Sequence, residues 1–169
     1  IEHTGGFDGD LQIGFKIEEM ADRIESLLRS IGLISGFSSL VYLVGHGASS
    51  INNTHYAGYD CGACCGRPGS VNARVAAHMA NDSQVRGILA SRGIEIPTLS
   101  QFVGALHDTT KDEIEYYDLE ILSEVNLRSH QKNAGLFIKA LDSNSMERSR
   151  RFATLSKAQT MGSIHNAVR

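Results

Sequence analysis

The sequence predicts an α/β fold with a mainly parallel sheet flanked by helices, and three observations lead to it. Leu40 to Val44 form a short apolar run, typical of a buried parallel strand, that breaks at glycine into a loop rich in Gly, Ser and Asn. Directly before this run, apolar residues recur at spacings of three and four from Ile17 to Ile31, as on one face of a helix. A second apolar run, Phe102 to Leu106, predicts another strand further along the chain.

The helix predicted from Ile17 to Ile31 is the clearest element of the sequence. We expect its Ile24, Leu27 and Leu28 side chains to pack on the sheet that contains Leu40 to Val44. Because this helix directly precedes a strand, it fits the crossover of a βαβ unit whose first strand lies upstream of this chain.

Two further helices should follow the glycine-rich loop. Pro68 and Ser70 offer a start for the first, which continues to Met79. Asp82 or Ser83 can cap the second.

Extended segments complete this part of the chain. Ile94 to Pro97 is expected to be extended, because proline disfavours a helical conformation in the residue before it. After the strand at Phe102 to Leu106, residues Ile114 to Leu119 predict a third, half-exposed strand. Residues 1–15, at the other end, are rich in glycine and predict an irregular lead-in.

The C-terminal part predicts two helices separated by a cap. Apolar residues around Leu136 indicate one helix and those around Phe152 another, with Asp142 to Ser145 as the polar break between them. We therefore divide the chain into an α/β domain at residues 1–125, which carries the candidate site, and a helical segment at 126–169.

Composition indicates an ordinary globular domain, since 41% of the 169 residues are apolar and 21% are charged. No apolar run approaches the roughly 20 residues that span a bilayer, so we expect any membrane contact to be peripheral or through a partner. From Arg128 onward the chain has eight basic and two acidic residues, whereas the part before Arg128 has eight basic and seventeen acidic residues. We interpret this basic tail as a solvated face or a contact with an acidic neighbour, not as a nucleic-acid site.

The loop after Leu40 to Val44 gathers metal-binding residue types. His46 stands at the strand tip, and all three cysteines of the chain, Cys61, Cys64 and Cys65, lie further along the loop. Imidazole nitrogen and thiolate sulfur suit zinc, and three clustered cysteines favour a reducing cytoplasmic compartment over a disulfide framework. Their spacing alone is not a tight zinc motif. In the alternative reading, His46 caps the strand end and Cys61 is a packed thiol.

Further polar residues are candidates for binding substrate or supporting the loop: Asn52, Asn53, Asp60, Arg74, His107 and Asp108. The asparagines and Arg74 could hold the loop and bind an anion such as bicarbonate near a helix start. Alternatively, the asparagines satisfy loop backbone and Arg74 pairs with an acid such as Asp60. His107 and Asp108 follow another predicted strand and could line a pocket at the same sheet edge as His46.

Other motifs fit less well. Cys61 to Cys64 is a Cys-x-x-Cys, but in thioredoxin-like motifs the helix opens directly, whereas here Cys65 to Gly69 intervene. A serine-hydrolase elbow needs Ser where His46 stands, and the glycine spacing of a Rossmann or phosphate-binding loop is absent.

The sequence closely resembles the DabA subunit of inorganic carbon transporters. The residues that carry the resemblance are Gly45-His46-Gly47, Asn52-Asn53, Asp60-Cys61-Gly62-Ala63-Cys64, Gly66, Asn72-Ala73-Arg74, Val85-Arg86, Gly93 to Pro97 and Phe102 to Asp112. One departure is Cys65, where the family pattern predicts glycine. The resemblance implies a divergent β-carbonic-anhydrase-like fold, of which this chain would be an incomplete, C-terminal portion.

That resemblance also implies a zinc site in two halves. His46 and Cys61 match the half formed by a histidine and a cysteine. The other half, a Cys-x-Asp-x-Arg loop, is not found here, since no cysteine precedes Cys61. On its own the chain is therefore expected to be catalytically silent and to hold zinc poorly.

The function implied by the resemblance is zinc-dependent hydration of CO2 to bicarbonate, coupled to a proton-conducting membrane subunit. The expected location is cytoplasmic, peripheral on the inner face of the cell membrane through that partner. The alternative is a non-catalytic zinc-binding or protein-interaction module built on the cysteine-rich loop.

Overall fold

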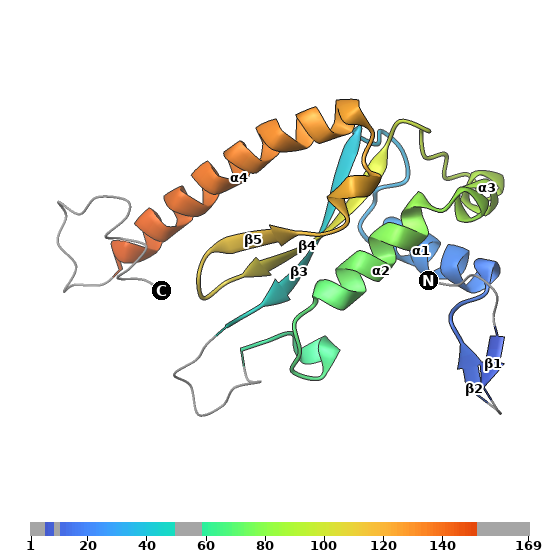
Figure 1. Cartoon of the computed structure of the whole chain (residues 1–169), viewed down its shortest axis with the longest axis horizontal. Helices are drawn as coiled ribbons and strands as arrows, with labels where there is room; N and C mark the ends of the chain where they lie inside the picture. The colour runs from blue at the N-terminus through green and yellow to red at the C-terminus, as the bar shows by residue number, and fades with distance from the viewer. Residues whose placement is uncertain (1–5, 9–10, 50–58, 152–169) are drawn as a thin grey trace.

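The computed structural model of the chain describes residues 6–8, 11–49 and 59–151 (Figure 1). Strands β3 (Leu40–Gly47), β4 (Gln101–Asp108) and β5 (Glu113–Tyr116) form a sheet in the order β3-β4-β5. β3 and β4 pair in parallel, whereas β4 and β5 are antiparallel. The predicted α/β class is confirmed. The expected mainly parallel arrangement holds only for the β3–β4 pair, so the sheet is mixed.

Helices cover both faces of this sheet. The part of the chain that the structure describes contains α1 (Ile17–Ser30), α2 (Ser70–Asn81), α3 (Ser83–Ser91) and α4 (Glu124–Ser149). α2 packs on β3 and β4, and α4 crosses the sheet on the other side (Figure 1). A separate antiparallel hairpin, β1 (Gly6–Asp8) and β2 (Leu11–Ile13), replaces part of the irregular lead-in expected there.

The apolar face of α1 is buried, as predicted, but its neighbours differ from the expectation. Ile24 and Leu28 are fully buried and Leu27 is half-buried. α1 packs chiefly on α3 and α2, because α2 already occupies the sheet face that α1 was expected to cover. Phe102 of β4 belongs to the same hydrophobic core, and Val41 and Leu43 of β3 pack against it, so α1 shares this cluster with the sheet.

The start of α3 follows the predicted chemistry. Oδ1 of Asp82 accepts hydrogen bonds from the backbone N–H groups of Gln84 (2.9 Å) and Val85 (3.0 Å), which makes Asp82 the N-cap. Arg86 then ties the helix to the next segment, since its guanidinium donates to the carbonyl oxygens of Ala80 (2.8 Å) and Ser100 (2.7 Å). Burial lowers the pKa of Arg86.

Close backbone contacts fix the distance between α2 and the sheet. A Cβ on Gly45 would lie 2.5 Å from the backbone of Gly69, just before α2, and one on Gly104 would lie 2.8 Å from Cα of Arg74. The N–H of Gly69 also donates to the carbonyl oxygen of His46 at 2.8 Å. Glycine is needed at these positions because any side chain would push α2 off the strands.

β3 is longer than the sequence suggested. It was expected to end at Val44 and to break into a loop at Gly45, but it continues to Gly47. The extension is stable because each added residue pairs in register with β4, up to Gly47 opposite Asp108. His46 therefore lies within a strand and not on a loop.

α4 corrects the predicted break between two C-terminal helices, since it runs unbroken through Asp142 to Ser145, the expected cap. Phe152, around which the second helix is expected, lies outside the described residues. The hydroxyl of Ser143 donates to the carbonyl oxygen of Lys139 (2.9 Å), and that of Ser145 donates to the buried Asp112 (2.8 Å). These polar side chains are satisfied by the helix and by the β4–β5 turn, so they do not compete with helical hydrogen bonds.

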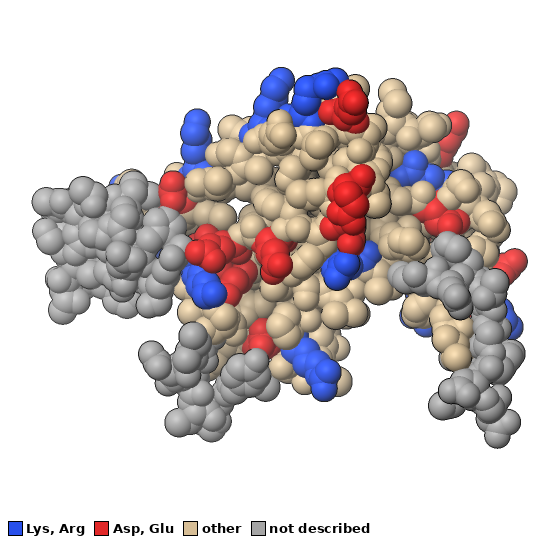
Figure 2. Space-filling view, viewed as in Figure 1, with Lys and Arg blue, Asp and Glu red and all other residues tan. Residues whose placement is uncertain are grey.

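The basic character predicted for the C-terminal part appears on α4. Between Glu124 and Asp142 this helix carries Arg128, Lys132 and Lys139 and no acidic residue, and all three basic residues are exposed. Lys and Arg side chains line the outer side of α4 at the top of the view in Figure 2. This exposure agrees with the interpretation of a solvated basic face.

An aromatic cluster joins α4 to the sheet. The His130 ring of α4 packs edge-on against Tyr116, with ring centroids 4.7 Å apart, and its Nδ1 lies 3.1 Å from the Tyr42 hydroxyl. Phe137 completes the cluster with an edge-on contact to Tyr42. Burial lowers the pKa of His130.

We expect His130 to make the fold less stable in acid. Because its pKa is lower in the folded state, the unfolded chain takes up a proton more readily as pH falls through about 6.5. The free energy of unfolding should therefore decrease from pH 7.5 to 5.5, and less so in His130→Gln. Urea unfolding at several pH values in this range measures how much the free energy of unfolding falls in the wild type and in His130→Gln. An equal fall in both proteins would contradict this role of His130.

Candidate functional site

The carboxyl ends of β3 and β4 bring two predicted site histidines to one edge of the sheet. His46 is the register partner of His107, and Gly47 is that of Asp108. Side chains alternate along a strand, so His46 and His107 lie on the same face as Tyr42, the face that α4 covers.

The loop that follows β3 returns to the end of that strand. Nε2 of His46 lies 2.7 Å from the carbonyl oxygen of Tyr59, and Oδ1 of Asp60 accepts a hydrogen bond of 2.8 Å from the N–H of Ala48. Both contacts involve the residues directly before Cys61. Asp60 therefore holds the returning loop against β3, next to His46.

Cys61 opens a tight turn, η2 (Gly62–Cys64). Its carbonyl oxygen accepts from the N–H groups of Cys64 (3.0 Å) and Gly66 (3.1 Å). Cys65 has a φ of 57°, in the left-handed region that favours glycine. This conformation gives a physical reason for the glycine that the family pattern predicts at position 65.

The thiols of this turn contact one another. A hydrogen bond with Cys61 raises the pKa of the Cys64 thiol, and Sγ of Cys64 also accepts from Nδ2 of Asn72 at 3.3 Å. Cys61 and Cys64 are half-buried, whereas Cys65 is exposed. Asn72 of α2 thus holds Cys64 in place.

Asp108 organises backbone at the end of β4. Its Oδ1 accepts from the N–H groups of Ser49 (3.2 Å), Thr110 (3.0 Å) and Lys111 (3.3 Å). Burial alone would raise the pKa of Asp108, but these hydrogen bonds from Ser49, Lys111 and Thr110 lower it below its usual value. A carboxylate with these contacts joins the loops after both parallel strands.

His107 faces the β4–β5 turn. Its Nε2 is buried and lies 3.5 Å from Oδ1 of Asp112, without a hydrogen bond to any described residue. Asp112 is held in turn by Ser145 and Arg148 of α4. His107 therefore lies between His46, at the carboxyl edge of the sheet, and Asp112, which binds α4.

Arg74 lies apart from the cysteine turn and pairs with Asp118. Its Nε and Nη2 donate to the two carboxylate oxygens at 3.0 and 2.6 Å, and its guanidinium stacks over the Tyr117 ring at 5.1 Å. The pair raises the pKa of Arg74 and lowers that of Asp118. The alternative in which Arg74 pairs with an acid is therefore confirmed, but the acid is Asp118 and not Asp60.

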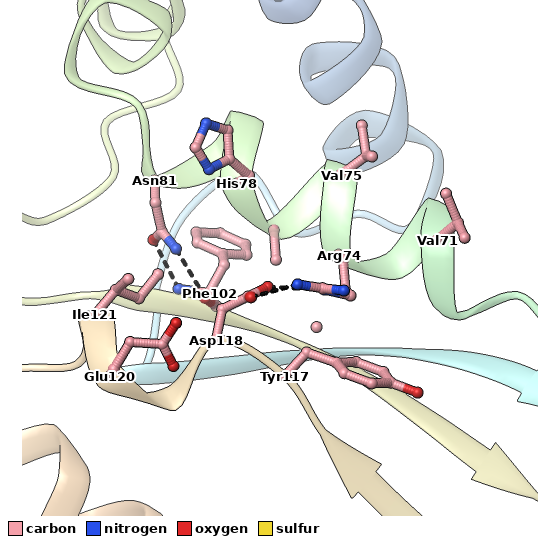
Figure 3. Close-up of a pocket in the computed structure, with 12 residues that line it drawn as sticks. Val71, Arg74, Val75, His78, Asn81, Phe102, Tyr117, Asp118, Glu120 and Ile121 are labelled. Carbon is pink, nitrogen blue, oxygen red and sulfur yellow. Dashed lines mark hydrogen bonds and ion pairs between the residues drawn. The ribbon is translucent and has the colours of Figure 1, made fainter. Parts of the chain in front are cut away.

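A hollow of about 380 Å³ lies beside this ion pair, between α2 and the segment after β5. In Figure 3 Arg74 and Asp118, which line it, point toward each other and are joined by dashed lines, and Asn81 bonds the backbone of Phe102. Its lining also includes His78, Tyr117, Glu120 and Ile121. Of the lining residues only Arg74 was a predicted site residue, and no sequence pattern indicated the hollow itself. It lies beside the middle of β4, not at the carboxyl edge with His46.

The residues at the carboxyl edge fit zinc as part of a site. His46 would supply a nitrogen and Cys61 a sulfur, which are zinc's usual donors. Within the described ranges no group of three or more His, Cys, Asp or Glu residues could hold a metal ion, so the two need further ligands. Asn52 and Asn53, the remaining candidates, fall outside the described residues.

Comparison with known proteins finds relatives along nearly the whole chain. The family model described as "Probable inorganic carbon transporter subunit DabA" matches residues 2–169. A protein of that name from Azotobacter vinelandii is 58% identical over 94% of this chain and 19% of its own length. Its counterpart from Nitrosospira multiformis is 49% identical over 96% of the chain and 18% of its own length.

The chain thus spans about a fifth of the length of these curated relatives. No solved structure matches it. In the part of the chain that the structure describes, no helix is both long and apolar enough to cross a bilayer.

Proposed function

This chain belongs to the DabA family of inorganic carbon transporter subunits, and from that membership we propose that His46 and Cys61 are two ligands of a zinc site that hydrates CO2. The names of the relatives support a role in inorganic carbon uptake. The zinc ligands, the hydration reaction and a β-carbonic-anhydrase-like fold are the parts that we propose.

One observation carries the proposal. His46 stands at the carboxyl end of a parallel strand, and its Nε2 contacts the carbonyl oxygen of Tyr59 at 2.7 Å, two residues before Cys61. The loop therefore returns the backbone to the end of β3 directly before Cys61, which supports the proposal. Ligands of α/β proteins gather at this edge of the sheet.

The surrounding residues have distinct tasks in this proposal. Asp60 and Asp108 fix the backbone of the loops that carry the ligands, through their bonds to Ala48 and Ser49. Bound zinc would supply a Lewis acid that activates water near neutral pH. The backbone of His46 is held at the end of β3, where its carbonyl oxygen accepts a hydrogen bond from the Gly69 N–H.

The free edge of β3 supports completion of the site by another part of the parent protein. Gln101 and Thr109 donate to the carbonyl oxygens of Ser39 and Gly47, so alternation turns the backbone groups of Tyr42 and Val44 away from β4. No described strand pairs with that edge. A parallel strand added there would end beside His46, where it could supply the missing cysteine and aspartate.

We also propose a membrane partner and a cellular location for the parent protein, on the basis of its family. A proton-conducting membrane subunit would bind the parent protein on the inner, cytoplasmic face of the membrane and make CO2 hydration directional. We likewise keep the division of the chain at residue 125 as a proposal.

Uptake of inorganic carbon tests the function in cells that make the parent-length protein with its membrane partner. Loss of a residue that only hydrogen-bonds a metal ligand already lowers metal affinity or activity about 10- to 100-fold, so His46→Ala and Cys61→Ser should each lower uptake at least about 100-fold. Cys65→Ser, in the same turn, is the matched control and should retain uptake. Undiminished uptake in both ligand variants, with zinc still lost, would instead favour the non-catalytic zinc-binding module.

A further inference from the structure

Cys61 and Cys64 are the two ends of one 3₁₀ turn. Cys61 precedes η2 and Cys64 closes it, with a hydrogen bond of 3.0 Å from the Cys64 N–H to the Cys61 carbonyl. This bond closes the turn and brings the Cys61 and Cys64 residues together, and the interaction of the two thiols raises the pKa of Cys64.

The third cysteine does not compete for this pairing. Cys64 and Cys65 are consecutive, and their Cα atoms are about 3.8 Å apart across a trans peptide, below the usual range of about 4.4 to 6.8 Å for a disulfide. Cys65 also adopts the left-handed conformation and is exposed, whereas Cys61 and Cys64 are half-buried. The turn thus selects one pair among three thiols.

We propose that Cys61 and Cys64 form a reversible disulfide, a redox-sensitive modification site on the loop beside His46. The oxidant is a small-molecule disulfide such as oxidised glutathione, and the step is thiol–disulfide exchange. Two S–H bonds and the oxidant's S–S bond break, and the Cys61–Cys64 bond forms. Two electrons and both protons pass to the oxidant, which leaves as two thiols.

The pair acts as a switch and not as an oxidoreductase. Residues 65–69 separate the motif from the start of α2 at Ser70, so the thiols lack the helix N-terminus that lowers the pKa of catalytic cysteines. Nδ2 of Asn72 lies 3.3 Å from Cys64 Sγ and keeps that thiol near its partner.

The consequence rests on the proposed function. If Cys61 is a zinc ligand, its sulfur can be held either by the metal or by Cys64, but not by both. Oxidation would remove the ligand and switch the site off, and bound zinc would protect the pair from oxidation.

The disulfide itself is tested on the 169-residue chain, whose three cysteines allow a direct reading by intact-mass and fragment-mass spectrometry. In a buffer of oxidised and reduced glutathione, Cys65→Ser should lose the mass of two hydrogens, with the bond mapped to Cys61 and Cys64, and the wild type should show the same bond whether or not Cys65 carries glutathione. Cys64→Ser should instead accumulate a mixed disulfide with glutathione. Glutathione adducts alone on Cys65→Ser would overturn the proposal.

The link to the metal is tested on the parent-length protein, read from the peptide that carries Cys61 and Cys64. Zinc at ten times its dissociation constant should raise the oxidant ratio needed for half-oxidation about tenfold. A disulfide whose formation zinc does not change would support the redox pair and contradict Cys61 as a ligand. Zinc protection that depends on Cys61 with no disulfide in its absence would overturn the redox pair and leave the proposed function standing.

Discussion

Asp112→Ala is expected to destabilise the chain by about 3 kcal/mol or more. The Asp112 side chain is only 2% exposed and accepts a hydrogen bond from Ser145 (2.8 Å), with Arg148 at 3.2 Å and Asn144 at 3.3 Å. Alanine would leave the Arg148 guanidinium and the Ser145 hydroxyl without their shared acceptor. It would also place a residue without a polar side chain at a φ of 53°.

The companion variant separates charge from shape. Asp112→Asn keeps a side chain that tolerates the left-handed conformation and can still accept from Ser145, so it should cost clearly less than alanine. Urea unfolding gives both values. Because Asp112 joins the β4–β5 turn to the last turns of α4, the loss should be greatest in hydrogen-exchange protection of that helix end. Wild-type stability of Asp112→Ala would show that Asp112 contributes nothing to holding α4.

Gly45→Ala and Gly104→Ala should each destabilise by about 1 to 3 kcal/mol, or more if α2 cannot shift. The new methyl group would lie 2.5 Å from Gly69 backbone in the first case and 2.8 Å from Cα of Arg74 in the second. Backbone atoms cannot rotate away as a flexible side chain can. Relief therefore requires α2 to move off the sheet.

Gly135→Ala is the matched control for these two variants. Gly135 lies inside α4, and a Cβ there meets nothing within 4 Å. Alanine should stabilise that helix by up to about 1 kcal/mol. Equal destabilisation in all three variants, measured by thermal unfolding, would contradict the account of close contacts between α2 and the sheet.

Local patterns predicted the elements whose stability depends on neighbours in the sequence. The α1 stripe and the Asp82 cap of α3 were found at their predicted positions, because periodicity and capping act within a few residues. The split of α4 was wrong because Asp142 to Ser145 resemble a cap in isolation. Only the distant Asp112, on the β4–β5 turn, explains why these residues remain helical.

The candidate site shows the same limit. The pattern of residues placed His46 at a strand end and Cys61 on the following loop. It could not reveal the ion pair between Arg74 and Asp118, since the two residues meet only when α2 lies on the sheet. Nor could it reveal the antiparallel direction of β5, because an apolar alternation does not specify strand direction.

Zinc bound per parent-length protein tests the central claim most directly. We expect about one zinc per chain in the wild type and in Cys65→Ser, and loss of that zinc in both His46→Ala and Cys61→Ser. Circular dichroism should first establish that all four proteins are folded. The 169-residue chain alone should hold zinc only weakly, since it supplies two ligands. Retention of one zinc per chain by folded His46→Ala and Cys61→Ser proteins would contradict the account.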